Sequence, residues 1–345
     1  MIPIQNVYYM LSYAFQVLNE QGYKNIATEQ FHNTAELMAA ILEKGIAIQL
    51  KRGLGKEYIL QTEALSSLRG KIDIAESIKT QSMLRKQLIC TYDEFSVNSI
   101  MNQIIKSTVE LLLRSNISKQ RKKNLRKLMV YFSEVDFIDL YTVNWNVQYN
   151  RNNQTYRMLI SICYLVVKGL LQTQSNGHTE LMDFLDEQRM CRLYEKFILE
   201  YYRKEFKNQF TANASQIPWQ LDNEENSMLP VMQSDIMLQS GEKVLIIDAK
   251  YYEHSTQVQF DKHTLHSGNL YQIFTYVKNK EYELREKNHT VSGMLLYAKT
   301  DEEIYPNNVY QMSGNQITVR TLDLNLPFDE IAGQLNTIAK THFDL

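Results

Sequence analysis

Hydrophobic and polar positions follow two different periods along this chain. In the first 50 or so residues, apolar side chains recur at three- and four-residue spacing, which predicts helices near the start and from Thr34 to Gln49. The apolar positions of the first helix are Val7, Met10, Leu11, Tyr13, Ala14 and Leu18. From Lys51 to Ile74 the pattern changes to short alternating runs interrupted by glycines, which predicts strands and turns projecting from a helical body. Helices are predicted again near Ser99–Arg114 and Lys119–Phe132.

The second half of the chain has an α/β pattern. The polar, turn-rich segment from Gln172 to His178 predicts a boundary between domains at 1–175 and 176–345. The elements predicted beyond it are a helix at Asp183–Phe206, strands at Met228–Leu238 and Lys243–Tyr252, a helix at Asn269–Asn279, a strand at Gly293–Tyr297, two further short strands and a helix at Phe328–Ala339.

Composition fits this division, because 345 residues are enough for two domains with separate cores. The net charge of −2 argues mildly against non-specific DNA coating. The three cysteines form no C-x-x-C pair, which argues against structural zinc and suits a reducing cytoplasm. The N-terminus lacks the features of a signal peptide, and the apolar run Met158–Leu171 is shorter than a membrane span. We therefore expect a soluble, cytoplasmic protein without membrane contact.

The stretch from Arg114 to Lys127 is strongly basic. Its cations are Arg114, Lys119, Arg121, Lys122, Lys123, Arg126 and Lys127. Two interpretations remain open at this point: a solvated helix face, or a surface that contacts DNA phosphates or an acidic partner.

The strongest chemical signal is an acid in Ser234-Asp235-Ile236 followed by the apolar run Val244-Leu245-Ile246-Ile247-Asp248-Ala249-Lys250. Because side chains alternate across a strand, Asp248 and Lys250 are expected on one face. A turn at 239–242 brings Asp235 back along the second strand. Buried charges require a partner, and a divalent metal held by Asp235 and Asp248 supplies one. D-x-K alone also occurs in hairpins with surface charges, but the combination predicts an active site.

Magnesium is the metal expected, since it prefers carboxylate and carbonyl oxygens. The main-chain carbonyl of Ala249 is a further ligand in this hypothesis. Lys250 would orient or deprotonate the attacking water, or stabilise charge on the phosphorane. These are the requirements of phosphodiester hydrolysis, so the residues predict a metal-dependent nuclease.

Other candidates lie on the flanking helices. Glu195 and Glu200 flank an apolar stripe, so that either reaches a metal at its edge or faces solvent. Gln272 and Tyr276 share one helix face at i, i+4 spacing, where they either bind a phosphate and brace the site or simply pack. His263 and His266 precede that helix and add little. No G-x-x-x-x-G-K-[ST] motif is present, so we expect no nucleotide hydrolysis by this chain itself.

These residues resemble the PD-(D/E)xK nuclease superfamily. Asp235, Asp248, Ala249 and Lys250 match its core motif, with Ser234 in place of the usual proline. Glu195 and the pair Gln272/Tyr276 match helix elements of the RecB-like branch. The resemblance implies an α/β C-terminal domain of restriction-endonuclease type, preceded by an α+β N-terminal domain of helices and a strand-rich finger around residues 51–75.

A closer resemblance is to the McrC family, nuclease subunits of McrBC-type restriction systems. The matching stretches are Ile2–Phe15, Lys51–Leu54, Gly70–Ile72, Asn102–Thr108, Ile247–Tyr252 and His266–Gln272. The resemblance implies that the N-terminal region docks into a hexameric AAA+ GTPase of McrB type and stimulates it. The partner would bind GTP and recognise modified, methylcytosine-type double-stranded DNA, and this chain would cut it with Mg²⁺, or Mn²⁺ as a substitute.

Three hypotheses of function therefore stand. The leading one is a Mg²⁺-dependent endonuclease subunit of a GTP-driven restriction complex. The alternative is a non-cleaving activator or scaffold of an NTPase, with a degenerate nuclease fold. The third is a stand-alone nuclease of RecB-like type, which the long N-terminal region without a DNA-binding motif makes less attractive.

Overall fold

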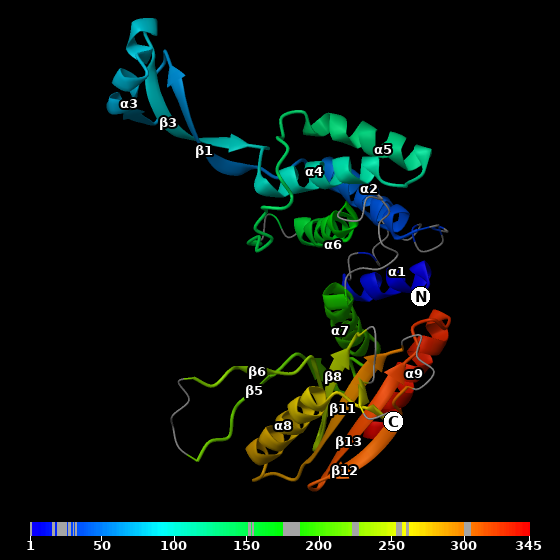
Figure 1. Cartoon of the computed structure of the whole chain (residues 1–345). Helices are drawn as coiled ribbons and strands as arrows, with labels where there is room; N and C mark the ends of the chain where they lie inside the picture. Colours follow the sequence, from blue (N-terminus) through cyan, green and yellow to red (C-terminus); the bar gives the residue numbers. More distant parts are fainter. Residues whose placement is uncertain are drawn as a thin grey trace. The chain divides into compact units, whose positions relative to one another are not determined.

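The computed structural model (Figure 1) describes residues 2–15, 18, 26, 29, 31, 33–150, 153, 155–174, 187–222, 228–252, 257–259, 262–299 and 305–345. The chain divides into two compact units. One unit, here called the sheet unit, combines Met1–His32 with Phe184–Leu345, and the other, the helical unit, comprises Asn33–Asp183. No helix of the described part of the chain has the length and apolar character that crossing a bilayer demands.

The helical unit is built on four helices. They are α2 (Thr34–Arg52), α4 (Ile100–Arg114), α5 (Lys119–Met129) and α6 (Tyr156–Gln174), with a short 3₁₀ turn η4 (Val130–Phe132) after α5. Side chains of Asn33, Ser99 and Ser118 accept hydrogen bonds from backbone N–H groups in the first turns of α2, α4 and α5. These caps account for the sharp starts of helices that the sequence pattern predicts.

A three-stranded finger projects from the helical unit (Figure 1). Its elements are β1 (Glu57–Leu65), β2 (Lys71–Asp73), α3 (Ile74–Lys79), η3 (Ser82–Arg85) and β3 (Leu88–Ser96), in the antiparallel strand order β1-β3-β2. The finger predicted around 51–75 is therefore too short, because its central strand β3 lies beyond that range. Gly70 has φ +67°, and a Cβ there would meet the Thr91 carbonyl oxygen at 2.3 Å.

The sheet unit contains a six-stranded mixed sheet in the order β12-β13-β11-β8-β7-β4. The strands are β4 (Thr211–Asn213), β7 (Ile236–Ser240), β8 (Lys243–Lys250), β11 (Thr290–Ala298), β12 (Asn308–Met312) and β13 (Asn315–Leu322). β8, β11 and β13 are parallel, and the other neighbours are antiparallel. The predicted strand at Met228–Leu238 is wrong at its start: it is split into β6 (Met232–Gln233), which pairs with β5 (Gln216–Ile217), and β7.

Helices cover both faces of this sheet (Figure 1). They are α7 (Glu187–Glu205), α8 (Ser267–Glu283) and α9 (Phe328–Phe343), and a small hairpin of β9 (Gln257–Gln259) and β10 (Lys262–Thr264) precedes α8. Ile273 and Val277 of α8 pack with Val244, Ile246 and Leu295 of the sheet. β8 is buried on both faces as a result, which explains why its sequence is an almost continuous apolar run.

The close approach of α8 to the sheet depends on Gly293. A Cβ at this position of β11 would lie 2.8 Å from Ile273 Cγ1 and 2.9 Å from Val277 Cγ2. Only a residue without a side chain leaves room for the helix at this point.

The N-terminal helix α1 (Ile4–Ala14) belongs to the sheet unit, whereas the sequence-based division places it with the helical domain. Its aromatic face explains the difference. Tyr9 stacks on Phe328 of α9 at 4.4 Å between ring centroids, and the ring of Tyr13 lies 5.7 Å from that of Phe197 in α7. Asn6 donates hydrogen bonds of 2.8 Å to the carbonyls of Leu324 and Leu326. Helical periodicity predicts α1 itself, but it cannot identify which distant surface the helix covers.

Candidate active site

The hairpin of β7 and β8 brings Asp235 and Asp248 together. Gly241, with φ +56°, occupies the two-residue turn, and Ile236 pairs with Ile247. The next residues outward are Asp235 and Asp248. Asp235 Oδ2 accepts a 2.9 Å hydrogen bond from the Ala249 N–H. Because the N–H and C=O of one residue point to the same neighbouring strand, the Ala249 carbonyl lies on the Asp235 side of β8.

Lys250 lies on the same face as Asp248, as the alternation predicts. Its Nζ is 2.8 Å from Asp248 Oδ2 and 3.3 Å from Gln272 Oε1. Gln272 Nε2 in turn donates a 2.9 Å hydrogen bond to the Tyr276 hydroxyl. The i, i+4 pair on α8 is thus a brace that reaches the lysine, rather than independent packing.

The Asp248 carboxylate is buried, with 1% of its side chain exposed. Its ion pair with Lys250 falls outside hydrogen-bond geometry, so neither carboxylate oxygen has a hydrogen-bond partner within the described residues. Lys250 supplies one positive charge against the two carboxylates of Asp235 and Asp248, so the cluster favours a further cation.

Burial and mutual repulsion set the pKa values of this cluster. Burial first, and then the charges of Asp248 and Glu195, raise the pKa of Asp235. Burial also raises the pKa of Asp248, although Lys250 opposes that effect. For Lys250, burial lowers the pKa, but the charges of Asp248 and Asp235 outweigh it, and the net pKa is raised. Lys250 is therefore protonated, and both Asp248 and Asp235 are stabilised by its single positive charge.

Glu195 on α7 approaches this cluster. Burial, together with the charge of Asp248, raises the pKa of its carboxyl, and Lys250 lowers it. The Cys191 thiol donates a 3.1 Å hydrogen bond to Glu195 Oε1, and burial raises the pKa of this thiol to about 12. Glu200 instead pairs with Arg203 at 2.7 Å. Of the two glutamates left open by the sequence, Glu195 is the one electrostatically coupled to the acids.

Sequence reasoning missed a polar network beside Lys250. Tyr297 of β11 pairs in register with Lys250, and its buried hydroxyl accepts a 2.9 Å hydrogen bond from Asn269 Nδ2. Tyr252 donates a 3.3 Å hydrogen bond to the carbonyl oxygen of the same Asn269 side chain. The His266 ring lies 5.4 Å from that of Tyr252, while the His263 side chain lies outside the described part. Asn269 is part of the apolar–polar pattern at the start of α8, but only the parallel pairing of β8 and β11 reveals its neighbours.

The donor set fits a hard divalent cation. Within the described residues, no three His, Cys, Asp or Glu side chains already form a metal-ligand group. The carboxylate of Asp248, the adjacent Asp235 carboxylate and the Ala249 carbonyl are nevertheless the oxygen ligands that magnesium prefers. Burial raises the pKa of both acids, so a divalent cation beside them would favour their ionised forms.

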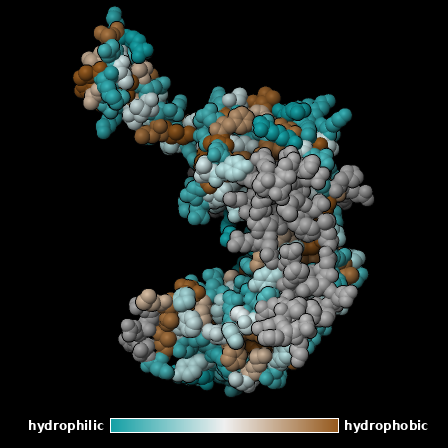
Figure 2. All heavy atoms as spheres, in the orientation of Figure 1, coloured by the Kyte–Doolittle hydropathy of each residue, from teal (hydrophilic) through white to brown (hydrophobic). Residues whose placement is uncertain are grey.

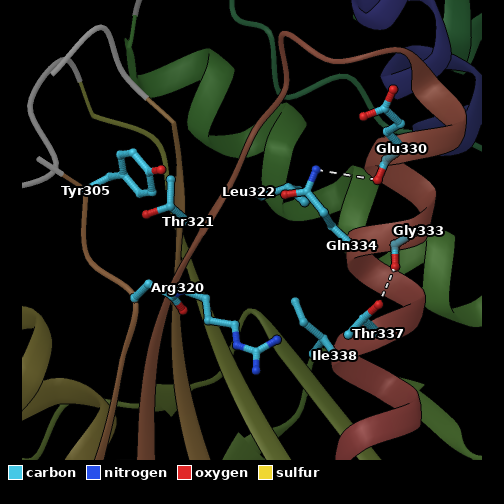
Figure 3. Close-up of a pocket in the computed structure, with 10 residues that line it drawn as sticks. Tyr305, Arg320, Thr321, Leu322, Glu330, Gly333, Gln334, Thr337 and Ile338 are labelled. Carbon is cyan, nitrogen blue, oxygen red and sulfur yellow. Dashed lines mark hydrogen bonds between the residues drawn. The ribbon is translucent and has the colours of Figure 1, made fainter. Parts of the chain in front are cut away.

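A pocket of about 610 Å³ lies elsewhere in the sheet unit, between β13 and α9 (Figure 3). Arg320, Leu322, Gln334 and Ile338 are among the residues that line it. None of the sequence-predicted site residues does. Arg320 is in register with Leu296, next to Tyr297, so it points to the opposite face of the sheet from Lys250.

The fold and the site define a two-unit α+β protein that carries an acid–lysine centre at the end of a mixed sheet. Sequence comparison then places it: the chain belongs to the family described as McrBC 5-methylcytosine restriction system component, whose profile matches residues 5–298.

Two relatives illustrate this membership. The type IV methyl-directed restriction enzyme EcoKMcrBC of Escherichia coli (strain K12) is 28% identical over 330 residues, which cover 94% of this chain and 93% of that protein. A chain of the refined half-complex from the tetradecameric assembly of Thermococcus gammatolerans McrB AAA+ hexamers with bound McrC has a TM-score of 0.50 at 18% identity. That match covers 97% of this chain and 76% of the other, and it concerns the fold.

Proposed function

We propose that this chain is the Mg²⁺-dependent DNA endonuclease subunit of a GTP-driven, modification-dependent restriction complex, with a sheet unit of PD-(D/E)xK type. The observation that carries the proposal is the buried Asp248 carboxylate, which has no hydrogen-bond partner among the described residues and lies beside Asp235 and Lys250. Buried charges in such a position destabilise a fold, and proteins retain them mainly at functional sites. Membership in a family described as a 5-methylcytosine restriction system component supports DNA carrying methylcytosine-type modification as the proposed substrate class.

Each residue has a role in this proposal. Asp235, Asp248, the Ala249 carbonyl and Glu195 would hold the Mg²⁺, with Mn²⁺ as a substitute. The bound metal supplies an activated water and neutralises charge on the phosphate. Lys250 would donate to the developing negative charge at the scissile phosphate, since its pKa is raised and it remains protonated. Gln272 and Tyr276 fix the position of Lys250 through the hydrogen bonds already formed.

The partner in this proposal is a hexameric AAA+ GTPase of McrB type, which binds the GTP. Support comes from the solved complex, whose title describes McrB AAA+ hexamers with bound McrC. The finger of this chain offers a suitable docking element, because large apolar side chains on it face solvent (Figure 2). They are Tyr58, Leu60, Leu68, Ile74, Ile78, Met83, Leu84 and Phe95. Stimulation of the partner's GTP turnover would depend on this surface.

Plasmid cleavage tests the nuclease. Methylated and unmethylated plasmid would be incubated with Mg²⁺, GTP and the cognate GTPase, using wild type and Asp248→Asn. We expect cleavage of methylated DNA by wild type and a loss on the order of 10³-fold or more in the variant. Asp323→Asn is the matched control, since Asp323 is bound to Lys299 at 2.7 Å outside the cluster. Cleavage by Asp248→Asn at the wild-type rate would refute the site.

The same experiment separates the alternative function. The exposed apolar finger is also what a pure activator or scaffold of an NTPase would require. GTP turnover that rises on addition of this chain, without DNA cleavage under any condition, would establish the activator and reject the nuclease. Cleavage of unmodified DNA without any partner would instead establish a stand-alone nuclease.

A further inference from the structure

Helix α5 gathers five cations on one side. Lys119, Lys122, Lys123, Arg126 and Lys127 fall within an arc of about 140° when residues are placed 100° apart around the helix. Four of them are exposed and Lys122 is half-buried. The arc is about 12 Å long, from Lys119 to Lys127. Figure 2 shows hydrophilic side chains over the visible part of this region.

The other side of α5 packs against the rest of the helical unit. Leu125 is fully buried, and Arg121 binds Glu36 at 3.3 Å and Glu43 at 2.8 Å in a nearly buried network with α2. Asn124 donates a 2.9 Å hydrogen bond to the same Glu43. The acids near the helix are thus already used by Arg121 and Asn124. Within the described residues, none of the five outward cations has an ion-pair partner.

In two other helices of this chain, cations form ion pairs with acids of the same helix. In α8, Lys278 pairs with Glu281 and Lys280 with Glu283; in α4, Arg114 pairs with Glu110. Such interleaved pairs are usual on a solvated helix face. α5 has no acid in its first turn, where one would favour the helix dipole, and its cations repel one another at i, i+3 and i, i+4 spacing. Arg126 and Lys127 lie in the last turn, where the dipole favours cations, so helix stability explains these two but not the three lysines before them.

We infer that the outward face of α5 is a binding site for the phosphate backbone of duplex DNA, with contacts that do not depend on sequence or methylation. Duplex DNA carries about one negative charge per 1.7 Å, or roughly seven over the length of this face. Lysine and arginine bound to phosphates are the usual positioning contacts. An acidic protein is a poorer match, because four of the five cations are lysines, and lysine is depleted in protein–protein interfaces.

The inference rests on the proposed function only in taking duplex DNA as the substrate. Its test uses the full chain, alone and with its cognate GTPase, and an unmethylated 30-base-pair fluorescent duplex in chelator, so that no cleavage occurs. Anisotropy would give the affinity over a range of salt concentrations. The variant replaces Lys119, Lys122, Lys123 and Lys127 with Gln. The matched control removes four cations that already have carboxylate partners, by Gln substitutions at Arg114, Lys278, Lys280 and Lys299.

The salt dependence decides the result. Each lost phosphate contact reduces the slope of log affinity against log salt by about 0.9, so we expect a reduction of up to about 3.6 in the α5 variant. We expect the same reduction on methylated duplex and little change in the control. An unchanged slope, or an equal reduction in both variants, would overturn the inference. Weaker GTPase binding with an unchanged DNA slope would overturn it in favour of an acidic protein surface.

The nuclease proposal can fail independently. Asp248→Asn keeps α5 intact and should retain the wild-type salt slope. A result in which wild type never cleaves DNA, while the α5 variant still shows a reduced slope of log affinity against log salt, would support the DNA-binding site on α5 and reject the nuclease activity.

Discussion

The carboxylate of Asp235 lies beside two other acids and one lysine that is already paired with Asp248. Its raised pKa means that the folded protein holds a proton on Asp235 over a pH range where the unfolded chain does not. The contribution of Asp235 to stability without metal is thus greatest below the unfolded pKa of about 4 and is lost as pH rises through the folded pKa. The charge that would hold the proposed metal is thus a cost to the fold without it.

Replacing this group should therefore stabilise the metal-free protein. Asp235→Asn can keep the hydrogen bond from the Ala249 N–H, and it leaves the Asp248–Lys250 pair intact. We expect a gain of roughly 1–3 kcal/mol at pH 8, since each pKa unit corresponds to about 1.4 kcal/mol and relaxation reduces the total. Thermal unfolding in chelator at pH 8 and pH 4 measures it.

The gain in the free energy of unfolding of Asp235→Asn should nearly vanish at pH 4, because Asp235 of the folded wild type is then protonated. Added Mg²⁺ should stabilise wild type more than Asp235→Asn. A variant less stable than wild type at pH 8 would show that Asp235 is compensated within the protein.

The central site residues could be predicted because they depend on local order in the chain. Alternation along β8 places Asp248 with Lys250, and the turn at Gly241 returns Asp235 to them. Tyr297 and Asn269 could not be predicted as neighbours of Lys250, because the pairing of β8 with β11 joins segments separated by a hairpin and a helix. The preference of Glu195 over Glu200 likewise depends on how α7 is oriented, which its apolar stripe does not determine.

The packing of α8 on the sheet is the contact that holds the Gln272–Tyr276 brace over Lys250. It depends on the absence of a side chain at Gly293. Gly293→Ala should force Ile273 and Val277 away from β11 and destabilise the sheet unit by about 1–3 kcal/mol. Chemical denaturation measures this change. DNA cleavage should fall more than stability alone explains, since Lys250 loses its support.

Gly333→Ala in α9 is the control for this substitution. A Cβ there meets nothing within 4 Å, and alanine favours a helix by up to about 1 kcal/mol, so this variant should be no less stable than wild type. An equal loss of stability in Gly293→Ala and Gly333→Ala would show that the position of α8 does not depend on Gly293.

Helices and strands with strong periodicity were predicted close to their observed bounds, as for α2, α4 and β8. The finger is longer than the sequence predicts, because β3 follows a turn-rich segment and its pairing with both β1 and β2 joins residues from 16 apart (Asp73 and Ile89) to 39 apart (Glu57 and Ser96). The strand before Asp235 was overextended, because Ser234 bonds to Ser215 and diverts the chain into the β5–β6 pair.

The assignment of α1 to the sheet unit gives a prediction for the protein as a whole. Tyr13 contacts Phe197 and Phe328, and its hydroxyl donates a 2.9 Å hydrogen bond to Glu205. Tyr13→Ala should cost about 1–3 kcal/mol. Hydrogen exchange should show reduced protection in α7 and α9, while α4 stays as in wild type.

Tyr131→Ala, which removes an exposed aromatic ring of the helical unit, should leave protection in α7 and α9 unchanged. Loss of protection in α2 and α4 after Tyr13→Ala would contradict the placement of α1.

The same placement has a consequence for synthesis of the protein on the ribosome. The aromatic helix α1 is made before the other described elements, and the α7 surface that it covers is translated about 170 residues later. At ordinary elongation rates this delay is on the order of ten seconds or more, during which the helical unit emerges complete. The nascent chain therefore displays an unpaired amphipathic helix throughout that interval, and chaperones that bind such segments would meet this protein at α1.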